Sequence, residues 1–126
     1  MIGLDDIMAR NPCGEFPVDR VRELLMQRGT QTIDAAGVFD LDISPVAKIW
    51  MFLETGLTTK EQQEAVIAKM AAMMPEDSPE YQSFMQAYVI SYKYPMLYLA
   101  RTTGVSTRAA ATEVTKQIVE FFREVI

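Results

Sequence analysis

Histidine is absent from this chain of 126 residues. That absence excludes catalysis by a Ser-His-Asp triad or a Cys-His pair, and it excludes zinc and haem sites that need an imidazole ligand. The Gly-x-Gly-x-x-Gly and Gly-x-x-x-x-Gly-Lys loops that hold nucleotide phosphates are also missing. We therefore predict that the protein is not an enzyme, and we assign it no catalytic residue, metal ligand or cofactor.

Cysteine and long apolar runs are scarce as well. Cys13 is the only cysteine, so a disulfide within the chain is excluded, and without a histidine to activate it we expect a structural thiol rather than a nucleophile. No run approaches 18 uncharged apolar residues, and the first residues lack the basic and apolar regions of a signal peptide. These features predict a cytoplasmic protein that does not span a membrane.

The charge of the chain is mildly acidic and unevenly distributed. The formal net charge is -5, which does not favour binding to nucleic acid or to anionic lipid. Residues 1–56 carry 5 basic and 9 acidic side chains, residues 57–80 carry 2 and 5, and residues 81–126 carry 5 and 3, so the segments run -4, -3 and +2. We expect the basic part to pack against the acidic part, and the alternative is an acidic face presented to a basic partner.

Apolar residues recur at helical spacing along most of the chain, whose length suits one domain. The sequence predicts an all-α fold, a compact single-domain bundle of five or six helices over residues 1–126. A connector with at most one helical turn is expected at residues 30–43, where an alternating pattern directs Phe39, Leu41 and Ile43 inward. The expected helices cover residues 17–28, 45–55, 59–74 and 79–103, a last helix follows Ser106 and runs to residue 126, and a short helical turn at residues 4–10 is a further candidate.

Three helix starts are marked by capping residues. Ser44 and Ser78 each precede a proline, which is the preferred order of an N-cap and a first helical residue. Thr58 and Glu61 have the spacing of a capping box. In the helix after Ser44, the apolar stripe expected to face the core contains Val46, Ile49, Trp50 and Leu53.

The segment 79–103 has the most unusual composition, because it holds all five tyrosines. Pro95 interrupts its periodicity, so we expect a proline-kinked long helix near 79–103, or two helices in sequence. The C-terminal helix is expected to pack against this segment at the centre of the bundle. One apolar stripe is assigned to the core, and it consists of Tyr81, Phe84, Met85, Tyr88 and Tyr92.

Two tyrosines of this segment lie off the apolar stripe. Tyr94 and Tyr98 are separated by four residues, and Arg101 follows one turn later. Tyrosine beside arginine is enriched in the residues that dominate protein interfaces. We therefore predict that Tyr94, Tyr98 and Arg101 bind a partner protein.

Two further hypotheses remain open. Nine methionines and the aromatic stripes are expected to fill the core, but they are also compatible with a homo-oligomer whose subunits bury more apolar surface than a monomer does. Asp40 and Asp42 are separated by one residue and offer oxygen ligands to Mg²⁺, which would make the chain a carboxylate-dependent enzyme.

One stretch of the chain resembles a known group of proteins. Residues 40–53, Asp-Leu-Asp-Ile-Ser-Pro-Val-Ala-Lys-Ile-Trp-Met-Phe-Leu, preceded by Asn-Pro-Cys at 11–13, are similar to a segment of small helical proteins of phage and bacterial genomes, some of them described as immunity proteins. The likeness covers residues 11–55, and Ala47 stands where an aspartate is expected before Lys48. The resemblance implies a small accessory protein that binds and neutralises another protein, and we expect a non-enzymatic binding module of this inhibitor or immunity type.

Overall fold

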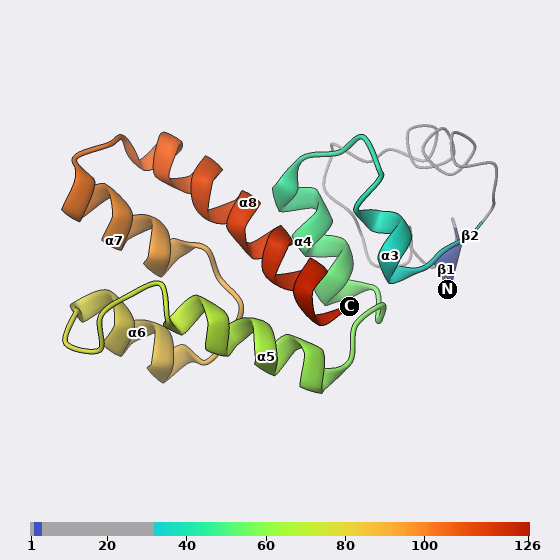
Figure 1. The fold of residues 1–126 in the computed structure, drawn as a ribbon, viewed down its shortest axis with the longest axis horizontal. Helices are drawn as coiled ribbons and strands as arrows, with labels where there is room; N and C mark the ends of the chain where they lie inside the picture. The colour runs from blue at the N-terminus through green and yellow to red at the C-terminus, as the bar shows by residue number, and fades with distance from the viewer. Residues whose placement is uncertain (1, 4–31) are drawn as a thin grey trace. The chain divides into compact units, whose positions relative to one another are not determined.

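A computed structural model describes residues 2–3 and 32–126, with side chains for residues 33–126 (Figure 1). The chain divides into two compact units, Met1–Thr58 and Thr59–Ile126, and each is described by itself. The helical turn considered at residues 4–10 and the helix expected at 17–28 lie outside the described residues, as does Cys13. The single domain over residues 1–126 stays a prediction.

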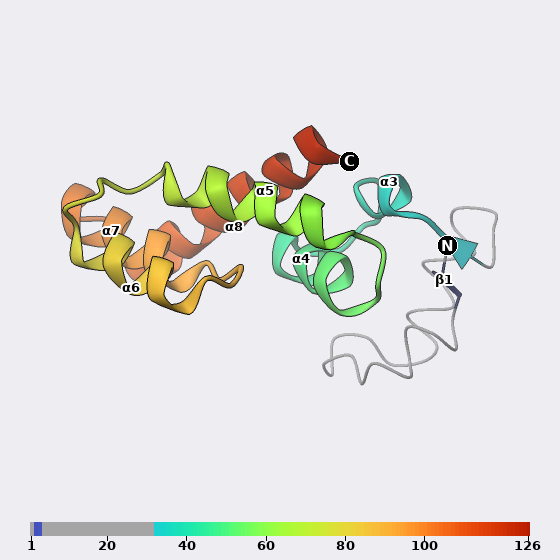
Figure 2. The same ribbon diagram turned by 90° about the horizontal axis from the view of Figure 1, so that it is seen from below.

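Among its described residues, 2–3 and 32–58, the first unit has a short strand pair and two helices. Strand β1 (Ile2–Gly3) pairs antiparallel with β2 (Thr32–Ile33). Helix α3 (Ala35–Val38) is a single turn, and α4 (Pro45–Glu54) packs against it (Figure 2). The connector predicted to hold at most one helical turn is therefore found, although Val38 is its most deeply buried residue and Phe39 and Ile43 are only half-buried.

Helix α4 begins as predicted but buries a different face. The Ser44 hydroxyl accepts a hydrogen bond from the amide of Ala47 at 3.2 Å, and Pro45 is the first helical residue. Trp50, however, is only half-buried, and the side chains that face the core are Ala47, Ile49, Met51 and Phe52. Eight of the ten residues are apolar, so periodicity could not select the face.

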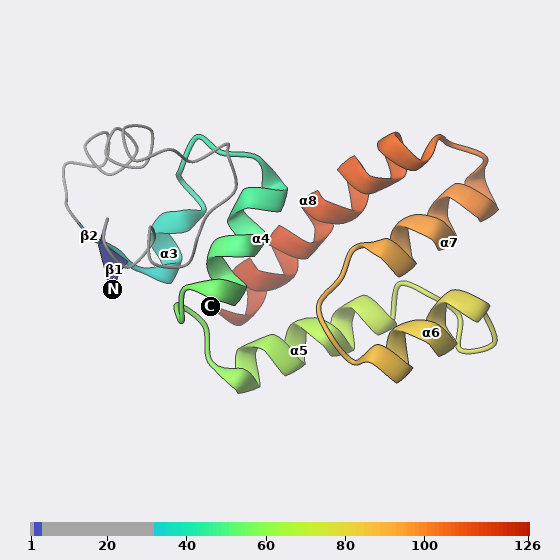
Figure 3. The same ribbon diagram turned by 180° about the vertical axis from the view of Figure 1, so that it is seen from behind.

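The second unit is a ring of four helices. They are α5 (Lys60–Ala71), α6 (Pro79–Ala87), α7 (Lys93–Thr103) and α8 (Thr107–Val125). Helix α5 contacts α6, α6 contacts α7, α7 contacts α8, and α8 returns to α5. In Figures 1 and 3, α5 and α6 lie on one side of the unit and α7 and α8 on the other. The predicted all-α bundle is confirmed, with six helices among the described residues.

Helix α8 contributes the longest face to this core. It packs against α7, as expected for the C-terminal helix and the tyrosine-rich segment, and also against α5. Phe121 and Val125 are half-buried. Thr115 is buried, and its hydroxyl is satisfied within the helix because it donates to the carbonyl of Ala111 at 2.8 Å. The buried residues of the four helices are Val66, Ile67, Met70, Phe84, Pro95, Ala110, Val114, Thr115, Ile118, Val119 and Phe122.

The capping box of α5 lies one residue later than predicted. The amide of Gln62 donates to the Thr59 hydroxyl at 3.1 Å, and the Gln62 side chain accepts from the amide of Thr59 at 2.8 Å. The Thr58 hydroxyl is buried and donates to the carbonyl of Phe52 at 2.6 Å. Both Thr58 with Glu61 and Thr59 with Gln62 fit the sequence pattern, and the buried bond of Thr58 decides between them.

The long helix expected at 79–103 is two helices, which was the second of the two alternatives. The chain breaks at residues 88–92 rather than at Pro95. Pro95 is the third residue of α7, where a missing N–H breaks no hydrogen bond of the helix, because the first four amides have no partner within it. Proline therefore lies at the start of a helix here, and a proline-kinked continuous helix is not formed.

Candidate functional site

Of the predicted partner-binding residues, Arg101 makes the strongest contact within the chain. Its Nε and Nη2 donate to the two carboxylate oxygens of Glu80 at 2.7 and 3.0 Å, which joins α7 to the start of α6. The Glu80 side chain is only 11% exposed, against 53% for Arg101. The hydrogen bonds from Arg101, and next that from the amide of Glu80 itself, hold the pKa of this carboxyl below its ordinary value.

The two predicted tyrosines have different surroundings. The guanidinium carbon of Arg101 lies 5.6 Å from the centre of the Tyr98 ring, so these two residues are brought together in a cation-π contact. Tyr94 is half-buried, and its ring meets that of Phe84 edge-on at 6.5 Å. Tyr94 therefore contributes to the packing of α6 against α7, and a partner-binding role for Tyr94, Tyr98 and Arg101 stays a prediction.

Apart from Leu97 on α7, the exposed large apolar side chains of this segment lie close together in sequence, at the end of α6 and in the connection to α7. We call this set the α6–α7 patch, and it consists of Met85, Tyr88, Val89 and Tyr92. Tyr88 is 49% exposed and Val89 54%. Met85, Tyr88 and Tyr92 were assigned to the core, and that assignment is wrong. The break after Ala87 takes Tyr88 and Tyr92 off the helical stripe, and Met85 is exposed on α6 itself.

The sequence did contain a signal for the break. Proline is favoured in the first turn of a helix and disfavoured in its interior, so Pro95 alone indicated a helix that starts shortly before it. The connecting residues have no glycine and no second proline, however, and their apolar side chains continued the pattern of the preceding helix. The apolar pattern of α6 therefore continues through residues 88–92, where no glycine or proline marks the end of the helix.

Tyr88 closes α6 in an unusual backbone conformation. Its φ is +48°, and it is the only residue other than glycine with a positive φ in the described part of the chain. Its amide still donates to the carbonyl of Phe84 at 2.8 Å, so the helix ends in the left-handed manner normally given to glycine, as at Gly104 after α7. A bulky residue in this region costs about 1 to 2 kcal/mol, and such cost is commonly retained where the side chain has a function.

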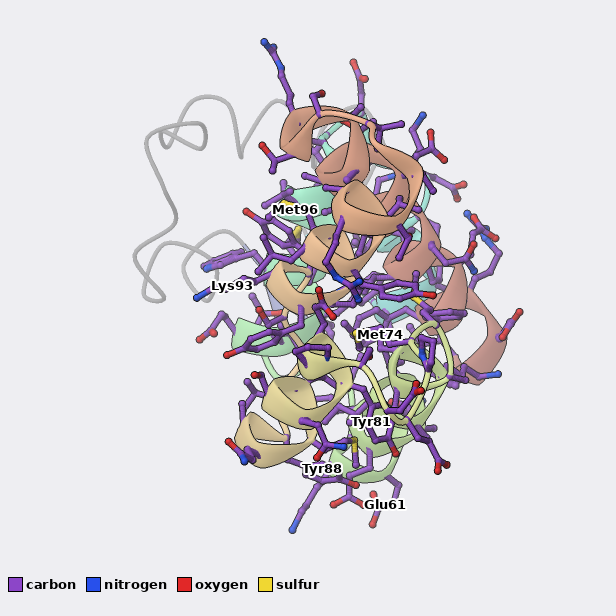
Figure 4. All side chains as sticks on the ribbon, turned by 90° about the vertical axis from the view of Figure 1, so that its left-hand side faces the viewer. Glu61, Met74, Tyr81, Tyr88, Lys93 and Met96 are labelled. Carbon is purple, nitrogen blue, oxygen red and sulfur yellow. The ribbon has the colours of Figure 1, made fainter. Side chains whose placement is uncertain are left out.

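Beyond Glu80 at the start of α6, the chain that carries the α6–α7 patch has a long stretch without an acidic residue. From Tyr81 to Thr112 there is no aspartate or glutamate, while Lys93, Arg101 and Arg108 are present. Lys93 is exposed directly after the patch, and its ammonium lies 5.6 Å from the centre of the Tyr94 ring. Figure 4 shows Lys93 extending outward at the edge of the unit, whereas Met74 lies in the interior.

The two aspartates considered as Mg²⁺ ligands lie in the other unit. Asp40 and Asp42 are both exposed, between α3 and α4. Within residues 33–126, no three acidic or thiol side chains come together in a way that could hold a metal ion. Two carboxylates without a third protein ligand make a weak site for a cation that prefers octahedral oxygen coordination.

Comparison of the chain with protein families, with curated proteins and with solved structures finds no match. The resemblance of residues 11–55 to immunity-type proteins therefore stays a prediction. Among the helices of residues 32–126, none is both long enough and apolar enough to cross a membrane.

Proposed function

We propose that this chain is a non-enzymatic protein-binding module that contacts its partner through the α6–α7 patch. The observation that carries the proposal is the gathering of four exposed apolar side chains within eight residues, at a point where the backbone is left-handed at Tyr88. Single exposed apolar residues need no explanation, but four within eight residues, a methionine and two tyrosines among them, have the composition of an interface.

The chemistry of the patch supports protein as the partner. Tyrosine has a large apolar ring with a hydroxyl at its edge, so at an interface the ring can contact the partner while the hydroxyl stays in solvent. Methionine adapts to different partner shapes because its side chain is unbranched and flexible. Single-stranded nucleic acid also stacks on tyrosine, but it would require more basic side chains around the rings than Lys93 and the paired Arg101 supply.

We propose further that the partner is a protein that this chain inhibits or neutralises. Support for this step comes from the similarity of residues 40–53 to immunity-type proteins of phage and bacterial genomes. That similarity lies outside the α6–α7 patch, so the proposed mode of action and the proposed binding surface are independent of each other.

An affinity experiment tests the binding proposal. The full chain is immobilised and exposed to lysate of its native host, beside a Tyr88→Ser/Val89→Ser variant and a control variant, Leu97→Ser. Leu97 is 38% exposed on α7 and is not a member of the patch. A stoichiometric partner that is captured by the wild type and the control, and lost by the patch variant, supports the proposal.

The other outcomes are also informative. A partner retained by the patch variant but lost by Tyr94→Ala/Tyr98→Ala/Arg101→Ala would move the binding surface to the residues predicted from the sequence. If no partner is captured and light scattering detects a stable oligomer, the chain is an assembly component, and the proposal is contradicted.

A further inference from the structure

We infer that α6 is a strap that opens from α7 while the other helices of the second unit stay folded, and that the pair of Glu80 with Arg101 holds it closed. This movement is a property of the fold and does not depend on the proposed binding function. Four features of α6 support it, namely its burial, its neighbours, its side-chain contacts with α7 and the backbone at Tyr88.

Helix α6 contributes little to the core of its unit. Phe84 is its one buried residue, whereas α5 buries three residues and α8 buries six. The ring of Phe84 is fully buried, so it keeps the helix closed most of the time. Elements with few buried apolar side chains are the ones that open locally while the rest of a protein stays folded. The exposed residues of α6 are Pro79, Gln82, Met85, Gln86 and Ala87.

The neighbours of α6 distinguish it from α7. Helix α7 also has one buried residue, Pro95, but it packs against α8 as well as against α6. Helix α6 packs mainly against α7, and its contact with α5 is smaller. Within the ring, α6 is therefore the helix that leaves with the least loss of packing. A helix of nine residues is too short to persist alone in water, so α6 unfolds when it leaves α7.

Two side-chain contacts close α6 on α7. Glu80, in the first turn of α6, accepts hydrogen bonds from Arg101 through both carboxylate oxygens. Phe84 follows four residues later on the same face of α6 and meets the ring of Tyr94. The guanidinium of Arg101 also lies over the ring of Tyr98 on its own helix, which positions it on α7. Because a bond to both oxygens has a fixed geometry, it breaks when α6 moves and forms again when the helix returns.

The backbone at the end of α6 favours opening. The amide of Tyr88 closes the helix by donating to the carbonyl of Phe84, in a left-handed conformation that costs a bulky residue free energy. That cost is released as soon as the last turn of α6 unwinds. The closed strap therefore has a strained end at Tyr88, and the ion pair of Glu80 at its start opposes opening.

Hydrogen–deuterium exchange of the full chain, followed for each amide by NMR, tests the strap. The amides compared are those of residues 82–87 in α6, 97–103 in α7 and 114–122 in α8. In the wild type, the amides of α6 should exchange at least about tenfold faster than those of α8, because opening one helix costs less than unfolding the unit. They should also exchange faster than the amides of α7.

Two variants that each break an ion pair between helices identify what opens. Arg101→Met removes the pair with Glu80, which is broken both when α6 opens and when the unit unfolds, so exchange in α6 and in α8 should rise about threefold. Lys69→Met is the matched control, because it removes the pair of Lys69 with Glu124, 2.8 Å apart, between α5 and α8. That pair stays intact when only α6 opens, so Lys69→Met should speed exchange in α8 about twofold and leave α6 unchanged.

Three results would overturn the inference. Equal exchange of α6 and α8 in the wild type, or an equal effect of Lys69→Met on both helices, would show that α6 opens only when the whole unit unfolds. Equal exchange of α6 and α7 would show that these helices open together, which leaves the pair between them no role in closing. If Arg101→Met leaves exchange in α6 unchanged, the pair does not hold the strap. Circular dichroism of each variant verifies that helix content is retained.

Discussion

At the scale of single residues, Tyr88 combines a backbone that favours glycine with a large side chain that is half outside the protein. The ring contributes less to folding than a buried aromatic would, while the positive φ carries its full cost. Local optimisation of stability would place glycine at this position, as it does at Gly104. The two helix ends therefore differ in cost, because Gly104 adopts the left-handed conformation without strain and Tyr88 does not.

Two substitutions at this position separate backbone from side chain. Tyr88→Ala and Tyr88→Gly both remove the ring, but only glycine adopts a φ near +48° without strain. We therefore expect the glycine variant to be more stable than the alanine variant by about 1 kcal/mol. Urea denaturation followed by circular dichroism measures the difference, and equal midpoints would show that the left-handed conformation carries no cost.

The pair of Glu80 with Arg101 predicts a dependence of stability on pH. The pKa of Glu80 is lowered in the folded chain, so this carboxyl stabilises the fold above its ordinary pKa of 4.5, and the contribution is lost as the pH falls through the lowered value. The wild type should be more stable than Glu80→Gln at pH 6, and the difference should shrink toward pH 2. Denaturation curves for both chains at a series of pH values test this, and a difference independent of pH would refute it.

At the scale of the helices, capping residues were the most reliable guide in the sequence. Ser44 and Ser78 cap α4 and α6 as predicted, because a serine followed by proline meets both requirements of a helix start. The capping box of α5 was placed one residue early, since two overlapping patterns fit. The end of α6 could not be predicted, because it depends on a left-handed tyrosine that no sequence rule favours.

The caps of α6 and α8 should differ in their contribution to stability. Ser78 is buried, its hydroxyl donates to the carbonyl of Pro75 at 2.7 Å, and it also accepts from the amide of Tyr81 at 3.1 Å. Ser106 is exposed and only accepts, from the amide of Ala109. Replacement by alanine should cost about 2 kcal/mol at position 78 and about 1 kcal/mol at position 106.

Thermal denaturation of both alanine variants, monitored by calorimetry, measures these costs. A larger loss for Ser106→Ala than for Ser78→Ala would contradict the expectation. Thr112→Ala serves as a control, because the Thr112 hydroxyl bonds to the carbonyl of Arg108 within an exposed helical turn and caps nothing.

At the scale of the whole molecule, the fold class could be predicted from the sequence, whereas the buried face of each helix could be predicted only in part. In α8, Val114, Ile118 and Phe122 recur at a spacing of four residues and lie in the core, and charged residues mark the opposite face. Helix α4 offered no such contrast, so Trp50 was placed more centrally than it lies. The α6–α7 patch was missed for a related reason, since exposed and buried aromatic residues look alike in a pattern of hydropathy.

The distribution of acidic residues predicts how the molecule responds to divalent cations. Asp40 and Asp42 are exposed, and no third carboxylate or thiol joins them within the described residues. Millimolar Mg²⁺ or Mn²⁺ should therefore leave the melting temperature unchanged, because only a ligand that binds the folded state raises it. A concentration-dependent rise that Asp40→Asn/Asp42→Asn abolishes would instead support the metal hypothesis.

The closure of the four-helix ring has a consequence for the order of its parts. The side-chain amide of Gln62, in the first turn of α5, lies 3.4 Å from the carbonyl of Val125 at the end of α8, so the ring begins and ends at one place. Gly104 and Val105, between α7 and α8, are exposed. A circular permutant joined from Ile126 to Thr59 and opened between Gly104 and Val105 would retain every pair of neighbouring helices, so we expect it to fold with the same ring.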